Sequence, residues 1–465
     1  MTACAGGAMG LTAVLSALFF PDDPGRVRLA FGIPGGVLFA LSACAYVSQS
    51  RRCAEAVLQR RDGIGAVAIG WLCVALCGAL PYWFSGLAIP FSSAFFESMS
   101  GFTTTGVTVL TLPREELPRA FLFWGAFSNW LGGLGVIVLI VAIFPFNGAS
   151  GSGVFRAEAP DSFRERVSPR IATSAKFIWG VYLLLTAALA ALLRFAGGMN
   201  WFDAVCHALS TISTGGFSTR SGGVAAFGNG AAEFIVAVFM ILGAINFSFH
   251  ILAMRGKFSQ FRKDAELRVF LAVLLGATLF VAFLTKSAGA SFFACANAIT
   301  TTGFATGGGV AMPRPAIMLL FVLAIVGGCS GSTSGGLKTM RLIVLFKTVA
   351  RQIRIHIRPQ ATIKIKIGGQ ALDENFVSHV CAHFIAFMFF AVFATASAYG
   401  SANDLPGAVS AAAATLTNSG FALGAPPDYA ALAPRTQLVL AFCMLFGRLE
   451  FFTVMALFTR DAWRK

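Results

Sequence analysis

Charged residues are scarce in this chain: Asp, Glu, Lys and Arg make up 12% of its 465 residues, whereas hydrophobic types make up 57%. A soluble globular protein carries about 25% charged residues, so a water-soluble enzyme or binding domain is excluded. Apolar stretches of about 20 residues recur along the whole length, as needed to cross a hydrocarbon core about 30 Å thick. The composition therefore predicts a polytopic membrane protein in contact with a lipid bilayer.

Cysteine pairs and catalytic constellations are absent as well. The ten cysteines are scattered without a CxxC spacing, so we interpret them as packing residues rather than disulfides or metal ligands. His379 and His383 have the i,i+4 spacing of a metal pair, but two histidines near a membrane boundary more often pack, and packing is the favoured interpretation. No nucleophile–base pair lies in an apolar segment, which argues against an intramembrane enzyme. No organic cofactor is expected in this chain.

A short hydroxyl-rich phrase that ends in glycine occurs four times. These glycines are 110, 87 and 117 residues apart, so the repeat predicts one structural unit with loops of variable length. One Thr-Gly turn would carry little information, but four copies, each after a short apolar segment, suit a ring around one axis. The copies are Thr103-Thr104-Thr105-Gly106, Ser213-Thr214-Gly215-Gly216, Thr300-Thr301-Thr302-Gly303 and Thr417-Asn418-Ser419-Gly420.

The chemistry of the four phrases suits a filter for a cation. Backbone carbonyls can replace the water around an ion, as in potassium channels, and glycine permits the torsions that aim carbonyls inward. No Asp or Glu falls within any phrase, which disfavours a carboxylate ring for divalent ions. We predict that every residue of the four phrases contributes to ion binding. Gly215 departs from the pattern, because the other copies have Ser or Thr there, so the ring is chemically uneven.

The predicted fold is all-α. Two leading transmembrane helices (residues 1–62) precede four pseudo-repeated units around one central ion pore, each with a transmembrane helix, a short pore helix, the phrase and a second transmembrane helix. The units are expected at 63–150, 151–262, 263–366 and 367–465. Their second helices are expected over about 117–146, 229–254, 312–355 and 434–459.

The short helices are expected at 92–102, 200–212, 291–299 and 405–416. They rise only about 15–20 Å and cannot cross the membrane, so each must end where non-helical backbone lines a cavity. Their partly negative carboxyl ends point toward the phrases, which favours a cation there. N-caps are predicted at Ser92, Asn200, Ser291 and Asn403–Asp404.

Positive charge is placed unevenly along the chain. The segments 51–62, 147–176, 255–268, 338–374 and 460–465 hold 25 of the 35 Lys and Arg residues. Positive loops mark the cytoplasmic side, so both termini are predicted to be cytoplasmic and the phrases to open outward. The net charge of +15 is thus interpreted as membrane orientation rather than nucleic-acid binding.

The second helix of the third unit is predicted to be interrupted at 327–336. Each glycine in a helix interior costs about 1 kcal/mol relative to alanine, and a flexible run held by a few weak hydrogen bonds could act as a gate below the filter. A plain helix kink remains an alternative. A phosphate-binding loop is disfavoured, because Leu337 precedes Lys338 and no strand leads into the run. The predicted gate residues are Gly327, Gly328, Ser330, Gly331, Ser332, Thr333, Ser334, Gly335 and Gly336.

Two basic residues are added to the predicted gate. Arg448 lies deep within the last span, and an intramembrane charge is costly and usually functional. It is predicted to face the pore below the filter; pairing with Glu450 or capping the carbonyls of a neighbouring loop are the alternatives. Lys338 either stands near the gate or extends to the cytoplasmic interface.

Several local sequences resemble the Trk/Ktr/HKT superfamily of potassium transport proteins, and within it TrkH-type subunits. They are Trp130-Leu131-Gly132-Gly133-Leu134-Gly135, Asn246-Phe247-Ser248-Phe249-His250, the run from Gly327 to Thr339, and Gly447-Arg448-Leu449-Glu450. The resemblance covers nearly the full chain. It implies one pore per chain, a homodimer, a bacterial cytoplasmic (inner) membrane location, and a cytoplasmic nucleotide-binding ring of the TrkA/KtrA type as gating partner.

The ion and the mode of transport follow from this resemblance. A serine at the first filter glycine is associated with sodium in this family, so Gly106 favours potassium. The leading hypothesis is therefore potassium uptake through a gated pore, with potassium bound at the four phrases and any nucleotide held by the partner. The alternative is a proton- or sodium-coupled cation symporter of the same architecture, which would need discontinuous helices and titratable relays.

Overall fold

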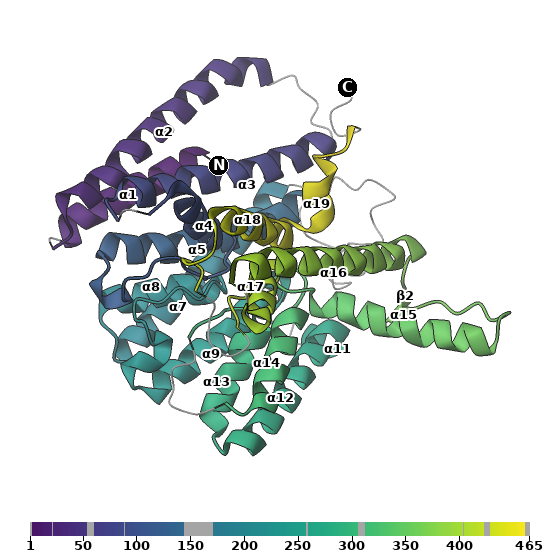
Figure 1. Ribbon diagram of the computed structural model, residues 1–465. Coiled ribbons are helices and arrows are strands. Elements are labelled where there is room, and N and C mark those ends of the chain that lie inside the picture. The colour runs from purple at the N-terminus through teal and green to yellow at the C-terminus, as the bar shows by residue number, and fades with distance from the viewer. Residues whose placement is uncertain are drawn as a thin grey trace.

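The computed structural model describes residues 2–20, 22–53, 60–87, 89–143, 171–256, 259–305, 312–402, 404–422 and 428–460. Within these ranges the regular secondary structure consists of helices and one small antiparallel hairpin, joined by loops (Figure 1). The basic segments predicted at 147–176 and 460–465 fall largely outside the described residues, and the segment at 51–62 does so in part. Asn403 lies outside them as well.

The helices that lead to the first phrase and on to the second are α1 (Thr2–Phe19), α2 (Gly25–Cys53), α3 (Arg60–Phe84), α4 (Phe91–Phe102), the 3-10 helix η1 (Arg114–Glu116), α5 (Arg119–Ile143), α7 (Ile171–Phe195) and α8 (Trp201–Ile212). The third phrase is flanked by η4 (Gly223–Phe227), α9 (Gly230–Ala244), α10 (Phe247–Met254), α11 (Ser259–Lys263), α12 (Ala265–Thr285), α13 (Ala288–Ile299) and α14 (Arg314–Val326). The chain ends with α15 (Thr339–Ile357), β1 (Lys366–Ile367), β2 (Gln370–Ala371), α16 (Glu374–Ala402), α17 (Leu405–Leu416), α18 (Pro434–Leu449) and α19 (Phe451–Ala456).

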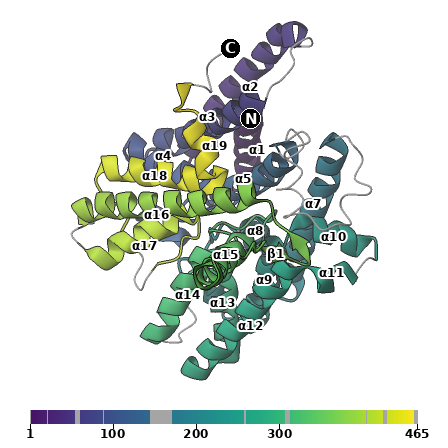
Figure 2. The same ribbon diagram turned by 90° about the vertical axis from the view of Figure 1, so that its right-hand side faces the viewer.

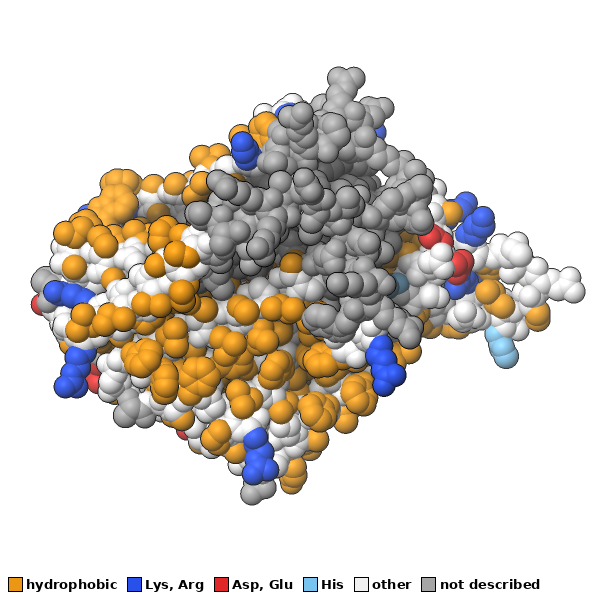
Figure 3. All heavy atoms as spheres, turned by 90° about the horizontal axis from the view of Figure 1, so that it is seen from above, with side chains coloured by type: hydrophobic (Ala, Val, Ile, Leu, Met, Phe, Trp, Pro, Cys, Tyr) orange, Lys and Arg blue, Asp and Glu red, His pale blue; other side chains and the backbone are white. Residues whose placement is uncertain are grey.

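Long apolar helices make this a multi-pass membrane protein. Among the described residues, five helices are long and apolar enough to cross a bilayer, and a sixth span results if α9 and α10 count as one. Large hydrophobic side chains on their outer faces stay exposed, as on α12, where Leu279 is 63% and Phe283 81% exposed. Figure 3 shows hydrophobic side chains over most of the described surface of one face, with Lys and Arg toward its margins. Such a surface suits lipid rather than water.

Four helices of twelve residues, α4, α8, α13 and α17, lie inside the molecule. Each contacts the long helix before it, and α8, α13 and α4 also contact α5, α9 and α18 respectively. The helix that follows one phrase therefore packs beside the short helix of another phrase. This arrangement brings the carboxyl ends of the short helices toward a common centre.

Two of the four predicted caps are confirmed. The side chains of Asn200 and Asp404 accept hydrogen bonds from backbone N–H groups in the first turns of α8 and α17. The predictions of Ser92 and Ser291 are wrong, because α4 and α13 begin earlier, at Phe91 and Ala288. Proline at the α4 cap position sets its start without a side-chain acceptor, and the Ser291 hydroxyl instead donates back along its own helix.

Two helices predicted to be continuous are broken. The span over 229–254 bends by 101° between α9 and α10, where the Asn246 side chain caps α10 by accepting from Ser248 N–H. The span over 434–459 breaks at Glu450, whose φ of 65° cannot continue a right-handed helix. The predicted interruption after α14 is confirmed, since α15 begins only at Thr339. Breaks thus follow three of the four phrases.

Helix α15 leaves the body of the molecule beside α16. The two lie side by side in Figure 1, with the small hairpin connecting them, and Figure 2 views α15 nearly along its axis. A separate small core holds them together, with Val344 of α15 against Phe376 and Val380 of α16. The segment that follows the interrupted helix is therefore an ordered extension of the fold.

Candidate functional site: a ring of four phrases above an interrupted helix

The four phrases share one backbone conformation. Their second residues all have a left-handed φ, between 50° and 55°, and their final glycines have φ between 61° and 79°. A positive φ is uncommon for residues other than glycine, so its recurrence at four matched positions indicates the same local fold. The second residues are Thr104, Thr214, Thr301 and Asn418.

Contacts between consecutive phrases close a ring. A Cβ atom added to Gly106 would lie 2.1 Å from the carbonyl oxygen of Gly215. A Cβ atom added to Gly216 would lie 2.0 Å from the Thr302 carbonyl oxygen. The corresponding distances are 2.2 Å from Gly303 to the Ser419 oxygen and 2.6 Å from Gly420 to the Thr105 oxygen. Each final glycine thus touches the third-position carbonyl of the next phrase, and the fourth phrase returns to the first. No side chain fits at these glycines without displacing backbone.

The hydroxyl groups of the phrases stabilise the ring through hydrogen bonds to the short helices. First-position hydroxyls donate to the last turns of the short helices, as Thr103 does to the Met99 carbonyl at 2.6 Å and Thr300 to the Ala296 carbonyl at 2.7 Å. In contrast, the carbonyls of the second and third positions accept no hydrogen bond within the described part of the chain. Unpaired buried carbonyls are costly unless a ligand or water satisfies them. These oxygens can therefore coordinate a dehydrated cation.

Buried polar groups support the segments that follow the first two phrases. The Glu97 carboxyl accepts from the Thr108 hydroxyl and from Val109 N–H, each at 2.9 Å. The His207 ring faces the Ser218 hydroxyl at 3.0 Å. Glu97 and His207 both stand six residues before their phrase, and Thr108 and Ser218 both stand five residues after its first position. Sequence analysis assigned no role to Glu97, although the matched spacing of the two pairs is visible in the sequence.

The third and fourth phrases use other supports. At the same two positions the third unit has Ala294 and Ala305, and the fourth has Ala411 and Ala422. In the third unit the amide of Asn297 instead bonds both the N–H and the carbonyl of Phe304, at 3.0 and 2.8 Å. The ring is therefore four-fold in backbone shape but not in its surrounding chemistry.

The interrupted segment between α14 and α15 lies directly against the ring. Gly335 N–H donates to the Thr301 hydroxyl at 2.6 Å, and Gly336 N–H donates to the Thr417 carbonyl at 2.8 Å. The Thr333 hydroxyl donates to the carbonyls of Ile212 and Gly243 at 3.0 and 2.9 Å. The segment thus reaches three of the four units. It is bonded far more densely than the few weak hydrogen bonds expected of a Gly- and Ser-rich run.

Glu266 of α12 ties together the two ends of this segment. Its Oε1 atom accepts from Ser330 N–H at 2.7 Å and from Met340 N–H at 3.1 Å. The side chain is buried, so these backbone donors have exchanged water for one carboxyl group. Sequence analysis did not find this residue, because an acid in the first turn of a helix is also typical of an ordinary helix start.

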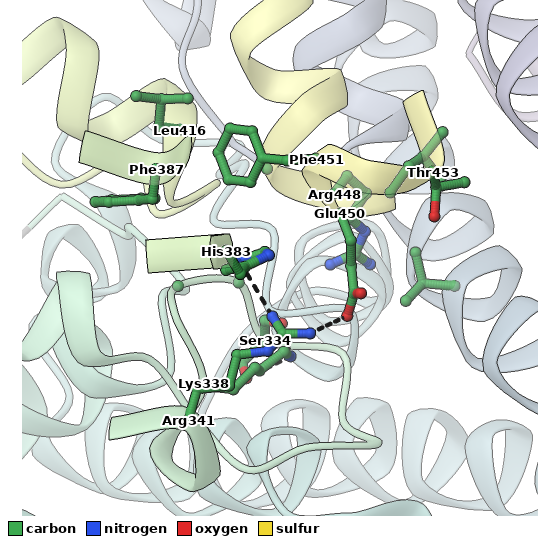
Figure 4. A pocket seen from close by; sticks show the side chains of 15 residues that line it. Ser334, Lys338, Arg341, His383, Phe387, Leu416, Arg448, Glu450, Phe451 and Thr453 are labelled. Atoms are coloured by element: carbon green, nitrogen blue, oxygen red, sulfur yellow. Dashed lines mark hydrogen bonds and ion pairs between the residues drawn. The ribbon is translucent and has the colours of Figure 1, made fainter. Parts of the chain in front are cut away.

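A group of ionisable side chains lines a pocket beside the segment (Figure 4). This cavity of about 120 Å³ is bordered by Ser334, Lys338, Arg341, His383, Arg448 and Glu450, among others. The Arg448 guanidinium donates to the carbonyls of Thr333 and Gly132, at 2.7 and 3.3 Å. The Lys338 ammonium donates to the Ser334 carbonyl, so Lys338 stands at the interrupted segment rather than extending away from it.

The alternatives for Arg448 are thereby separated. Glu450 pairs with Arg341, not with Arg448. Arg448 caps the carbonyls of a neighbouring loop, as one alternative held, and that loop is the interrupted segment itself. His383 faces Arg341 at 3.3 Å, and its ring packs on Phe451 with centroids 5.2 Å apart, which agrees with a packing role.

On the side that follows the phrases, two loops are joined through Glu115 of η1. Its carboxyl accepts from the hydroxyl and the N–H of Ser221, at 2.6 and 2.9 Å. The hydroxyl hydrogen bond, with the N–H bond second, lowers the pKa of the Glu115 carboxyl. This link ties the loop after the first phrase to the loop after the second.

Comparison with known proteins gives a consistent result. The family model TrkH, described as "Cation transport protein", matches residues 33–463. The Trk system potassium uptake protein TrkH of Halomonas elongata is 37% identical over 97% of this chain and 95% of its own length, and that of Escherichia coli K12 is 36% identical with the same coverage. The crystal structure of the potassium transporter TrkH from Vibrio parahaemolyticus superposes with a TM-score of 0.88 at 33% identity, covering 100% of this chain and 97% of that one.

Proposed function

The chain belongs to the TrkH family of cation transport proteins, and from this premise we propose that it takes up potassium across the cytoplasmic membrane through the ring of four phrases. The relatives named above are potassium uptake proteins by name. Potassium is the substrate in this proposal, and it binds at the carbonyls of the phrases.

One observation carries the proposal most strongly: the closed succession of glycine-to-carbonyl contacts around the ring. Because each final glycine touches the next third-position carbonyl, the carbonyls form a continuous rim rather than four separate turns. Rings of carbonyls select among monovalent cations by replacing their hydration shells. The absence of Asp and Glu from the phrases supports a monovalent rather than a divalent ion.

Gating belongs to the interrupted segment and its two basic neighbours in this proposal. Backbone of the segment contacts the phrases directly, and the Arg448 and Lys338 side chains stand beneath it. A positive charge on the route of a cation in a low-dielectric setting raises the barrier to permeation. Movement of the segment and of these charges together would open the path.

The partners remain proposals drawn from the family resemblance: a second copy of the chain and a cytoplasmic nucleotide-binding ring. Helix α15 follows the gate directly and projects from the body (Figure 1), so it can transmit a movement of the nucleotide-binding ring to the gate. Of its basic residues, Arg341 pairs with Glu450 and Arg351 with Glu374. We propose that Arg354 and Arg358, near its end, are the basic residues that contact the cytoplasmic nucleotide-binding ring. In this proposal both termini lie on the same, cytoplasmic side, as the distribution of Lys and Arg indicates.

A coupled symporter is the second candidate, and one observation favours it. Discontinuous helices are typical of coupled transporters, and the structure has breaks after three phrases where one was predicted. Uptake that requires a proton or sodium gradient would distinguish this candidate from a passive gated pore.

The deciding experiment is potassium flux into liposomes that contain the purified chain. Rubidium-86 uptake should follow an outward potassium gradient and should be competed by potassium far more than by sodium. Repeating the assay with imposed proton and sodium gradients separates the two candidates. A chain that inserts normally and conducts neither ion would refute the proposal.

A further inference from the structure

The second phrase lacks a side chain that the other three have. In the first, third and fourth phrases the third residue carries a hydroxyl that bonds the first-position hydroxyl. The pairs are Thr103–Thr105 at 2.9 Å, Thr300–Thr302 at 2.8 Å and Thr417–Ser419 at 2.8 Å. Gly215 breaks this pattern: the Ser213 hydroxyl donates to the carbonyls of Leu209 and Ser210 in its short helix, as the other first-position hydroxyls do in theirs, but it faces no third-position hydroxyl.

The place of the missing side chain is occupied by Asn129 of α5. A Cβ atom added to Gly215 would lie 2.2 Å from Asn129 Nδ2, 2.4 Å from its Cγ and 2.8 Å from its Cβ. The Asn129 side chain is 0% exposed. Neither its Nδ2 nor its Oδ1 has a hydrogen-bond partner among the described residues. Packing against Gly215 is therefore the contribution that the structure shows for this amide.

The corresponding positions in other units show that Asn129 is unusual. Gly132, Gly243 and Gly447 stand in the helices after the first, second and fourth phrases, and each packs on the carbonyl of the residue just before its phrase. Three residues before these glycines lie Asn129, Met240 and Met444, all fully buried. Among these three helices, the polar side chain appears in α5, the helix that packs against the phrase without a third-position hydroxyl.

The contact matters because of what Gly215 does in the ring. Its carbonyl oxygen is the group that Gly106 touches. A glycine backbone has more freedom than any other, and no hydroxyl pair fixes this one. We propose that Asn129 is a positioning residue for selectivity: its side chain fills the space beside Gly215 and holds that carbonyl in the ring. The inference rests on the proposed filter function and adds to it the residue that positions the Gly215 carbonyl, one of the four third-position carbonyls of the ring.

A swap of the two positions tests the proposal. Asn129→Ala leaves a void and Gly215→Ser collides with the amide, so each alone should lower the potassium-to-sodium flux ratio by about tenfold, a typical coupling for residues in contact. The double variant Asn129→Gly with Gly215→Ser, which also removes the Cβ that would lie 2.8 Å from the new one, should recover the parent ratio to within about twofold, because the hydroxyl introduced at position 215 can then bond Ser213 as Ser419 bonds Thr417. Asn129→Leu, which keeps the number and branching of the side-chain heavy atoms, should retain the ratio.

The controls separate this inference from the proposed function. Ser128→Ala removes a buried hydroxyl from the same helix turn, one that donates to the Gly125 carbonyl within α5 itself, and it should leave the ratio unchanged. Gly106→Ser reports on the ring itself. If Gly106→Ser changes the ratio but Asn129→Ala does not, or if the double variant is no better than Gly215→Ser, the role of Asn129 is wrong while the filter stands. If Gly106→Ser has no effect either, the filter assignment fails. Melting temperature and yield in detergent are measured for all variants, and the ratio is compared only among those that fold.

Discussion

Arg448 and Thr333 lie 115 residues apart in the chain, yet the guanidinium of one donates to the carbonyl of the other at 2.7 Å. The same guanidinium reaches Gly132, which packs on the carbonyl of the residue before the first phrase. One side chain of α18 therefore connects the interrupted segment to the wall of the ring. If the segment is the gate, as proposed, the charge and the hydrogen bonds of Arg448 both favour the closed arrangement.

Replacing Arg448 with alanine should raise potassium flux. A hydrogen bond to a charged group contributes about 1.5–3 kcal/mol, and its loss would shift a closed-to-open equilibrium by roughly tenfold or more. Selectivity should change little, because the ring keeps its glycines. Stopped-flow flux into liposomes measures the effect, with Arg435→Ala, an exposed arginine at the far end of α18, as the matched control. Flux at or below the parent level in a folded protein would contradict the gating role.

Glu266 should control how firmly the segment is held. Glu266→Ala leaves Ser330 N–H and Met340 N–H buried without an acceptor, and each orphaned donor costs about 1–3 kcal/mol. We expect faster flux, lower melting temperature and increased amide hydrogen exchange at both donors. Glu266→Gln keeps one oxygen acceptor and should fall between the parent and the alanine variant. Equal exchange rates at Ser330 and Met340 in all three proteins would show that the carboxyl does not hold the segment.

The sequence predicted the elements that depend on local pattern and missed those that depend on distant partners. Repeated phrases, short helices and the glycine-rich break are all visible along the chain. The breaks at Asn246 and Glu450 were missed, because hydropathy continues through them and only the cap and the Arg341 pair reveal why the helix stops. Glu266 was missed for a similar reason: its partners are 64 and 74 residues away.

The final glycines should differ in how they tolerate substitution. A Cβ would approach a carbonyl oxygen to 2.0–2.2 Å at Gly106, Gly216 and Gly303, but only to 2.6 Å at Gly420. Serine at the first three should therefore shift preference toward sodium more than Gly420→Ser does. The potassium-to-sodium flux ratio of the four single variants gives the order. Gly86→Ser, at a positive-φ glycine with open space around it, controls for backbone strain alone. A Gly420 variant as impaired as the others would show that crowding at the carbonyl is not what decides the ratio.

Glu97 should stabilise the ring through the segment that follows the first phrase. Its carboxyl holds Thr108 and Val109 from inside α4, so Glu97→Ala should destabilise the folded protein by about 3 kcal/mol, the sum expected for two donors left unpaired. Thr108→Ala should cost less, since it removes one partner and leaves the carboxyl bonded to Val109. The double variant should cost less than the sum of the two single changes, because both remove one shared interaction, although Thr108→Ala also removes the hydroxyl that accepts from Leu110 N–H.

Two units have a polar side chain six residues before the phrase, and two do not. Where Glu97 and Thr108 stand in the first unit, the third and fourth units have alanine at both positions, so their outgoing segments rest on packing or on Asn297. Thermal unfolding in detergent and the potassium-to-sodium ratio are the two measurements, with the exposed Glu116→Ala as control. Glu97→Ala should lower both the melting temperature and the ratio. A lower melting temperature with an unchanged ratio would mean that Glu97 supports the fold but does not position the ring, and the pairing with Thr108 would then carry no role in selectivity.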